Sequence, residues 1–116
     1  MIEVLRSKIH RAVVTDANLN YEGSITIYKG LMEASWISEY EKVTVVNINN
    51  GARFETYVIQ GEDKNNAICL NGAAARLVSV ADKVIIMAYR FIDEEDLLPT
   101  YKPTIVVVND DNEIIS

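Results

Sequence analysis

The chain has 116 residues, of which 49% are hydrophobic, and it carries a formal net charge of −6 with a pI near 4.7. This length suits one domain and leaves no room for two, and an acidic surface argues against nucleic acid as a partner because it repels phosphate. No run of 18 or more apolar residues is present, so we expect no membrane span and no membrane partner.

The predicted elements are short strands separated by turn signals. Asn49-Asn50-Gly51 is the strongest hairpin signal, because Asn-Gly readily supplies the positive φ angles of a type I′ turn. Residues 83–89 and 104–108 are almost continuously apolar, which predicts burial on both faces. Strands are expected at residues 2–6, 9–15, 24–28, 42–49, 52–60, 67–70, 83–89 and 104–108.

The segments between these strands have the composition of turns and short helices. Residues 16–18 are predicted as a turn and 61–66 as a polar loop, and helical turns are expected at 30–36 and 72–76. The acidic run 93–96 is typical of a solvated helix start. The pattern therefore predicts a mainly β protein: a small closed barrel with a few short helices, forming a single domain over residues 1–116.

Composition also bears on assembly and compartment. The apolar share is high for so small a domain, so we expect part of the surface to be buried against other subunits. Cys69 is the only cysteine and cannot form an internal disulfide, and the segment Met1–Arg6 lacks the features of a signal peptide. We therefore expect a cytoplasmic protein in which Cys69 is a small buried hydrophobe.

The Gly23-Ser24 peptide bond is a candidate for self-processing. A serine hydroxyl can attack the carbonyl of the preceding residue if the backbone is held in a strained geometry, and glycine there tolerates conformations that other residues resist. Taken alone, Gly-Ser more often marks a turn or the start of a strand.

Two further sets of polar residues could form a binding site. Arg6, Lys8 and His10 share one face of a strand by alternation, and Arg53 with Tyr57 would place an anion clamp beside a proton donor. The alternative is that these are the solvent side of a half-exposed sheet. The small residues after Asn71, in the run 72–76, would let a ligand approach backbone N–H groups, or would simply cap a helix.

Several chemistries lack the residues that they require. His10 is the only histidine, and no metal-ligand spacing or nucleotide-binding glycine motif is present, so we expect neither a metal nor a nucleotide cofactor. A hydrolase could use Ser24, His10 and Asp16, but nothing like a Gly-x-Ser-x-Gly motif surrounds Ser24.

Three stretches, at residues 21–26, 50–57 and 71–76, together resemble the aspartate 1-decarboxylases, small pyruvoyl-dependent enzymes that make β-alanine for pantothenate and coenzyme A synthesis. Residues 7–12, 15–19 and 102–103 also resemble that family. The resemblance implies a double-psi β-barrel and a cytoplasmic homotetramer with active sites where subunits meet. It also allows a maturation factor as a partner, because some members of that family need one.

The resemblance implies self-cleavage at Gly23-Ser24 into residues 1–23 and 24–116, leaving a covalently bound pyruvoyl group derived from Ser24. Thr56 would stabilise the processing intermediate, and Asn71 would assist it. A regular strand would place Thr56 and Tyr57 on opposite faces, which a bulge or a strand end would resolve.

The same resemblance assigns the residues of catalysis. The pyruvoyl carbonyl would form a Schiff base with L-aspartate and withdraw electrons while carbon dioxide leaves. Tyr57 would return the proton, and Arg53 with Lys8 would bind a substrate carboxylate. Thr56 and the run Gly72, Ala73 and Ala74 would hold the substrate, whereas His10 has no assigned step. The competing interpretation is a non-enzymatic β-barrel that binds a partner and in which Gly23-Ser24 is only a turn.

Overall fold

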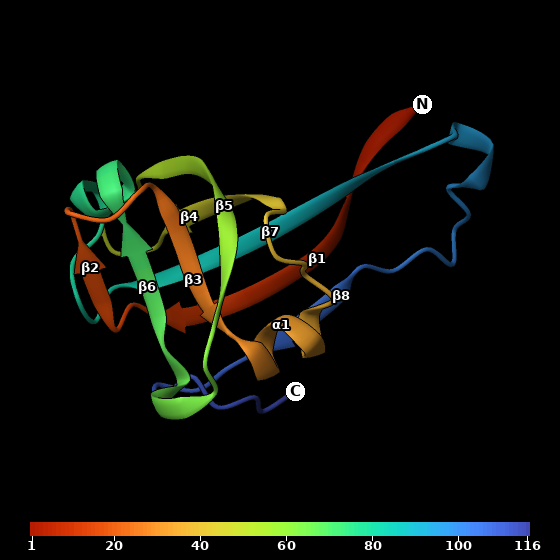
Figure 1. Ribbon diagram of the computed structural model, residues 1–116. Coiled ribbons are helices and arrows are strands. Elements are labelled where there is room, and N and C mark those ends of the chain that lie inside the picture. Colours follow the sequence, from red (N-terminus) through yellow and green to blue (C-terminus); the bar gives the residue numbers. More distant parts are fainter.

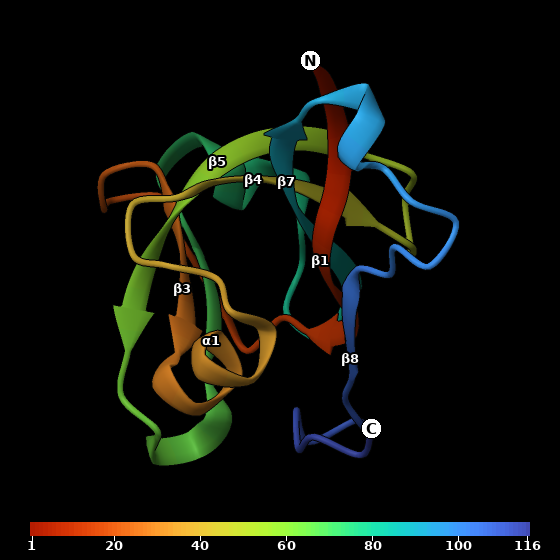
Figure 2. The ribbon, with the colours of Figure 1, turned by 90° about the vertical axis from the view of Figure 1, so that its right-hand side faces the viewer.

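The computed structural model describes residues 1–116 and is mainly β. Eight strands form a sheet with the order β2-β6-β3-β5-β4-β7-β1-β8, which curls around one core (Figure 1, Figure 2). This arrangement fits the expected small barrel. The strands are β1 (Ile2–Val13), β2 (Asp16–Asn18), β3 (Ser24–Tyr28), β4 (Lys42–Asn47), β5 (Arg53–Gly61), β6 (Ile68–Asn71), β7 (Lys83–Ile92) and β8 (Thr104–Val107).

The helices are short and lie between strands. One is α-helical, α1 (Lys29–Ser35), and three are 3₁₀ helices: η1 (Lys64–Asn66), η2 (Gly72–Leu77) and η3 (Glu94–Asp96). The helical turns predicted at 30–36 and 72–76 are confirmed, and the acidic run at 93–96 is exposed as expected. None of these helices has the length and apolar character needed to cross a membrane.

The core lies on the inward face of the curled sheet. Its apolar members alternate along several strands, such as Ile25 and Ile27 of β3, as expected where one sheet face packs on the core. Fully buried members include Ile9, Ile25, Ile27, Val43, Val45, Val58, Ile68, Leu70, Val84 and Ile86. The prediction that 83–89 and 104–108 are buried on both faces is wrong for the single chain. Val84, Ile86 and Ala88 are buried whereas the residues between them are partly exposed, and Ile105 of β8 is exposed.

Non-local pairing explains two further differences from the predicted elements. Residues 2–13 form one strand rather than two, and register shifts after Leu5 and Ile9, with Arg11 at φ 69°, absorb its irregularities. Residues 16–18 form a strand rather than a turn, because they pair with β6 in parallel.

The predicted hairpin is confirmed, since β4 and β5 pair antiparallel from Lys42–Tyr57 to Val46–Arg53. Its turn is not type I′: Gly51 has φ 77°, but Asn50 does not have a positive φ. The connection is a longer loop, in which the Gly51 N–H donates to the Asn47 carbonyl at 2.8 Å.

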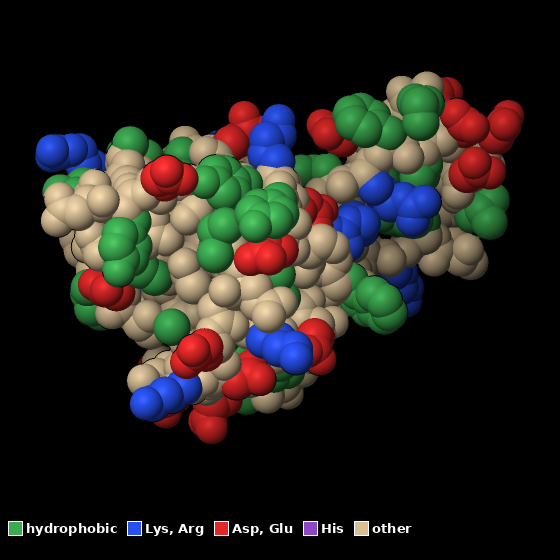
Figure 3. All heavy atoms as spheres, viewed as in Figure 1, with side chains coloured by type: hydrophobic (Ala, Val, Ile, Leu, Met, Phe, Trp, Pro, Cys, Tyr) green, Lys and Arg blue, Asp and Glu red, His purple; other side chains and the backbone are tan.

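The start of β1, the end of β7 and the segment containing η3 extend together beyond the barrel (Figure 1). They form a lobe that stands apart from the main body in Figure 3 and contribute to a molecule measuring 44 × 28 × 25 Å. The lobe exposes large apolar side chains: Met1, Phe91, Leu97 and Leu98. In a single chain this apolar surface is left uncovered.

Candidate active site

The pairing of β3 with β6 brings the predicted processing residues together. Ser24 lies opposite Asn71 in this antiparallel pair, and the Asn71 Nδ2 group donates to Ser24 Oγ at 2.9 Å. Both side chains are 4% exposed. The Ser24 hydroxyl is therefore held by a side-chain amide at the first residue of β3, directly after the Gly23 carbonyl.

Gly72 packs closely against the backbone of Gly23, on the N-terminal side of the Gly23-Ser24 peptide bond. It has φ 65°, and a Cβ there would lie 2.6 Å from the Gly23 nitrogen and 2.8 Å from the Tyr21 carbonyl oxygen. Gly23, in contrast, does not have a positive φ, and a Cβ there would meet only the Asn71 carbonyl oxygen at 4.0 Å. Glycine suits the proposed chemistry at position 23, but the backbone conformation and close approach that require glycine occur at Gly72.

A hollow of about 380 Å³ adjoins the Gly23-Ser24 bond. Its lining includes five predicted site residues, Gly23, Thr56, Tyr57, Ala73 and Ala74, together with Phe54, Glu55 and Leu77. With Ser24, Asn71 and Gly72 beside it, this hollow gathers the processing residues, the predicted proton donor and the predicted substrate-binding backbone.

Thr56 and Tyr57 both line this hollow although β5 is regular at that point. Residues 53–57 of β5 pair with β4 in unbroken register, so neither a bulge nor a strand end separates the two side chains. On its other edge β5 begins to pair with β3 only at Val58, opposite Ile25. The edge of β5 at Thr56 and Tyr57 is therefore open, and side chains from both faces can border the same hollow.

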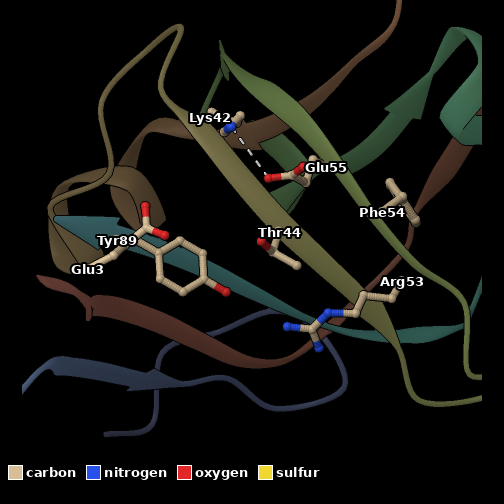
Figure 4. Close-up of a pocket in the computed structure, with 7 residues that line it drawn as sticks. All are labelled: Glu3, Lys42, Thr44, Arg53, Phe54, Glu55 and Tyr89. Carbon is tan, nitrogen blue, oxygen red and sulfur yellow. Dashed lines mark ion pairs between the residues drawn. The ribbon is translucent and has the colours of Figure 1, made fainter. Parts of the chain in front are cut away.

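Arg53 lies in a second hollow, of about 540 Å³ (Figure 4). Arg53 reaches into it from β5 and Tyr89 from β7, whereas Phe54 points away. Lys42 and Glu55 form an ion pair of 3.5 Å across its rim, while Arg53 has no carboxylate partner. Arg53 is thus an unpaired cation in a polar hollow that shares Phe54 and Glu55 with the hollow beside Gly23 but does not itself line the latter.

Lys8 faces the same side of the sheet as this second hollow. Lys8 pairs with Met87, Met87 with Thr44, and Thr44 with Glu55, so these four side chains form a row across four strands. At the usual strand spacing, Lys8 lies about 14 Å from Glu55. Lys8 also makes no ion pair, and within a single chain it lines neither of the two hollows.

The other predicted residues of β1 have different surroundings. Arg6 forms an ion pair with Glu41 and donates to the Trp36 carbonyl at 2.7 Å, so the bulge at Arg6 removes it from the face of Lys8. His10 has a buried Nδ1 without a hydrogen-bond partner. Burial, then the charges of Lys8 and Arg11, lower the pKa of His10 below its ordinary value.

The residues of the alternative hydrolase do not form a triad. Ser24 Oγ is held by Asn71, His10 Nδ1 has no partner, and an Asp16 carboxylate oxygen accepts from the Ala17 N–H at 2.8 Å. Elsewhere in the chain, no three His, Cys, Asp or Glu side chains gather as they would around a metal ion.

Sequence reasoning missed three residues at these sites: Thr26, Cys69 and Tyr89. Asn71 Nδ2 also donates to Thr26 Oγ1 at 3.1 Å, and the Cys69 thiol contacts Asn71 Oδ1 at 3.1 Å. Cys69 is half-buried rather than a fully buried hydrophobe. The alternation of β3 and β6 would have indicated Thr26 and Cys69 once the pairing of these two strands was known.

Known proteins resemble this chain along nearly its whole length. The profile of the family described as aspartate decarboxylase matches residues 1–115. Proteins named aspartate 1-decarboxylase from Caldicellulosiruptor saccharolyticus and Clostridium novyi are 66% and 60% identical to it, over 99% and 97% of this chain and 89% and 91% of theirs. One of the same name from Sulfurimonas denitrificans is 59% identical over 97% of this chain and 93% of its own.

Proposed function

Because the chain belongs to the aspartate decarboxylase family, we propose that it cleaves itself between Gly23 and Ser24 and decarboxylates L-aspartate to β-alanine and carbon dioxide. The β-alanine would supply pantothenate and coenzyme A synthesis. One observation carries the cleavage proposal: the Ser24 hydroxyl accepts a 2.9 Å hydrogen bond from Asn71 at a bond whose Gly23 side is packed against Gly72.

Cleavage follows from chemistry that the chain itself supplies. Ser24 Oγ attacks the Gly23 carbonyl carbon, the C–N bond breaks, and the hydroxyl proton moves to the freed nitrogen to leave an ester. Asn71 holds the attacking oxygen by a hydrogen bond from Nδ2. Thr56, which lines the hollow beside Gly23, stabilises the oxyanion of the intermediate. Elimination then releases the Gly23 carboxylate, and the dehydroalanine at position 24 takes up water and loses ammonia to become a pyruvoyl group.

The surroundings of Ser24 fit a pyruvoyl group. The group is uncharged and no larger than serine, Asn71 offers it N–H groups, and the methyl side chains of Ala73 and Ala74 leave room in the adjoining hollow. When present, this group supplies a carbonyl that binds the substrate amine and withdraws electrons from the α-carbon while carbon dioxide leaves.

The remaining steps belong to side chains of the two hollows. Tyr57 lines the hollow beside Gly23 and returns a proton to the α-carbon. Thr56 and the backbone of Gly72, Ala73 and Ala74 hold the substrate. An acidic substrate also needs a cation, and Arg53 suits a carboxylate because its guanidinium is planar, unpaired and can bind both oxygens.

Assembly would unite the two hollows. In one chain, neither Arg53 nor Lys8 lines the hollow beside Gly23, and the lobe of Met1, Phe91, Leu97 and Leu98 leaves apolar surface exposed. We therefore propose a homotetramer in which a second copy brings Arg53 and Lys8 to the Ser24 of the first. A single cysteine suits a reducing compartment, and this supports the proposal that the enzyme acts in the cytoplasm.

The test is carbon dioxide release from L-aspartate labelled at the α-carboxylate, with β-alanine followed by NMR. The wild-type chain should produce both products in equal amounts, and Ser24→Ala should produce neither. Thr15→Val is a matched control that removes a hydroxyl from outside the site. Turnover by Ser24→Ala would refute the proposal, and a folded wild-type chain without any turnover would favour the binding-module alternative.

A further inference from the structure

We propose that Cys69 is a positioning residue for self-cleavage: its thiol holds the Asn71 side-chain amide in the orientation that donates to Ser24. This inference rests on the proposed function, because it concerns the rate at which the Gly23-Ser24 bond is cleaved. Cys69 does not touch the reacting atoms and acts only through Asn71.

The register of β3 and β6 places four polar side chains in one block. Thr26 lies opposite Cys69, and Ser24 lies opposite Asn71, while the alternate residues Ile25, Ile27, Ile68 and Leu70 fill the core. The Asn71 amide contacts all three neighbours: Nδ2 donates to Ser24 Oγ at 2.9 Å and to Thr26 Oγ1 at 3.1 Å, and the Cys69 Sγ–H donates to Oδ1 at 3.1 Å.

In this block the Asn71 Nδ2 group acts only as a donor and Oδ1 only as an acceptor. Both hydrogens of Nδ2 have hydroxyl acceptors, but a hydroxyl both gives and accepts. Thr26 could donate to an amide oxygen instead, and so could Ser24, whose own proton makes only a long contact of 3.5 Å with the Glu22 carbonyl. The hydroxyls alone therefore do not select the orientation of Asn71. The Cys69 thiol does, because sulfur is a poor acceptor and could not replace Oδ1 as a partner for the NH₂ group.

The orientation of Asn71 changes the reactivity of Ser24. With the NH₂ group toward Ser24, the N–H donated to Oγ stabilises the alkoxide that forms as the hydroxyl gives up its proton for the attack. With the amide reversed, Oδ1 would face that charge and oppose it. A residue that fixes the amide thus favours the cleavage-competent form.

The thiol keeps its proton in this position. Burial, with the charge of Asp16 adding to it, raises the pKa of the Cys69 thiol. Asp16 lies on β2 directly opposite Cys69. At neutral pH the side chain is therefore an S–H donor toward Asn71 and not a thiolate.

Three substitutions at position 69 separate this role from simple packing. Cys69→Ser keeps a donor, whereas Cys69→Ala and Cys69→Val remove it. We expect Cys69→Ser to cleave at least as fast as the wild type, and the other two to cleave about three- to tenfold more slowly, as the loss of one hydrogen bond predicts. A packing role gives the reverse order, because a polar serine would then be the most damaging change.

The rates are measured by intact mass spectrometry on freshly purified, uncleaved chains, with thermal unfolding followed in parallel. Thr15→Val is the matched control: the Thr15 hydroxyl bonds to the Ile68 backbone of the same strand at 3.0 Å but does not contact Asn71. This variant should lose stability and keep its cleavage rate. Equal rates for all three Cys69 variants, or the slowest rate for Cys69→Ser, would overturn the inference.

A second measurement does not depend on cleavage. In the uncleavable Ser24→Ala chain, solvent exchange of the Asn71 side-chain amide protons is followed by NMR. Adding Cys69→Ala should accelerate this exchange, and adding Cys69→Ser should not; identical exchange in both would refute the inference. A wild-type chain that stays whole would refute the proposed cleavage instead, and the exchange data would then decide the role of Cys69 alone.

Discussion

At the residue scale, the closest backbone approach at the site is between Gly72 and Gly23. A Cβ on Gly72 would overlap the Gly23 nitrogen and Cα at 2.6 and 2.7 Å, and its φ of 65° disfavours any side chain. We expect Gly72→Ala to lower the free energy of unfolding by about 1–3 kcal/mol and to slow cleavage more than tenfold, because Gly23 must move.

Gly23→Ala provides the comparison, because a Cβ there meets only one atom at 4.0 Å. It should change the free energy of unfolding by less than about 1 kcal/mol. Urea unfolding of the two variants, made where possible in the uncleavable Ser24→Ala chain, measures the difference. Equal losses of stability would show that the contact between Gly72 and Gly23 is not the constraint.

Tyr57 could act in self-cleavage or in decarboxylation, and one substitution separates these two roles. It lines the hollow beside Gly23, but the Ser24 hydroxyl bonds to Asn71 and not to it. Tyr57→Phe should therefore cleave at the wild-type rate and release carbon dioxide at least about a hundredfold more slowly, as loss of a proton donor predicts. Wild-type turnover in the cleaved variant would remove Tyr57 from the mechanism.

His10 links stability to pH. Because burial, Lys8 and Arg11 lower its pKa in the folded chain, the unfolded chain binds the proton more readily below the ordinary pKa of about 6.5. This contribution to stability should be complete above that pH and should be lost as the pH falls through the lowered value. Urea unfolding at several pH values from 7 to 5 should thus show a shallower loss for His10→Gln than for the wild type. The same dependence of unfolding free energy on pH in both chains would show that His10 does not link stability to pH.

At the element scale, the buried Asn112 side chain makes three of the hydrogen bonds that hold the segment after β8 to the barrel. Asn112 is 1% exposed; it accepts from the Val13 N–H at 2.7 Å and donates to the carbonyls of Val13 at 2.8 Å and Asn66 at 3.1 Å. Asn112→Ala should cost about 2 kcal/mol of unfolding free energy, because it leaves buried partners unpaired. Asn20→Ala, on an exposed turn, is the control, and a thermal melt showing equal effects would contradict this role.

Elements defined by neighbouring residues were predictable, and those defined by distant partners were not. The β4–β5 hairpin and the helical turns at 30–36 and 72–76 depend on local signals, and the structure confirms them. Strand β2 exists only because Asp16–Asn18 pairs with a segment more than fifty residues later. The continuity of β1 likewise depends on pairing with β7 across bulges, which no local pattern reveals.

At the scale of the whole molecule, the candidate site is divided between two hollows. The resemblance predicted the residues of the site, and the fold brings Gly23, Ser24, Thr56, Tyr57 and Asn71 together. Arg53 and Lys8 do not line the hollow beside Gly23, although the hollow of Arg53 adjoins it through Phe54 and Glu55. Local sequence patterns do not show which surfaces a second copy would complete. The distribution of the site residues between two hollows was therefore not predictable from them.

The division predicts complementation between two inactive variants. Ser24→Ala cannot form the reactive carbonyl, and Arg53→Ala lacks the carboxylate-binding cation, but in a mixed tetramer one copy can supply what its neighbour lacks. Random assembly of equal amounts should restore about a quarter of the sites. The assay is decarboxylation by co-expressed chains, with each variant alone as control. No recovery in mixed tetramers would indicate that each site is built from one chain.

The most direct test of the account is the intact mass of the chain under denaturing conditions, before and after warming. We expect the 13.0 kDa chain to give two species of about 2.6 and 10.4 kDa, in proportion to residues 1–23 and 24–116. The larger species should be lighter than a chain starting with serine by the mass of one ammonia, which identifies the pyruvoyl group. A single species near 13.0 kDa, unchanged after long warming and after addition of cell extract as a source of a maturation factor, would contradict the account.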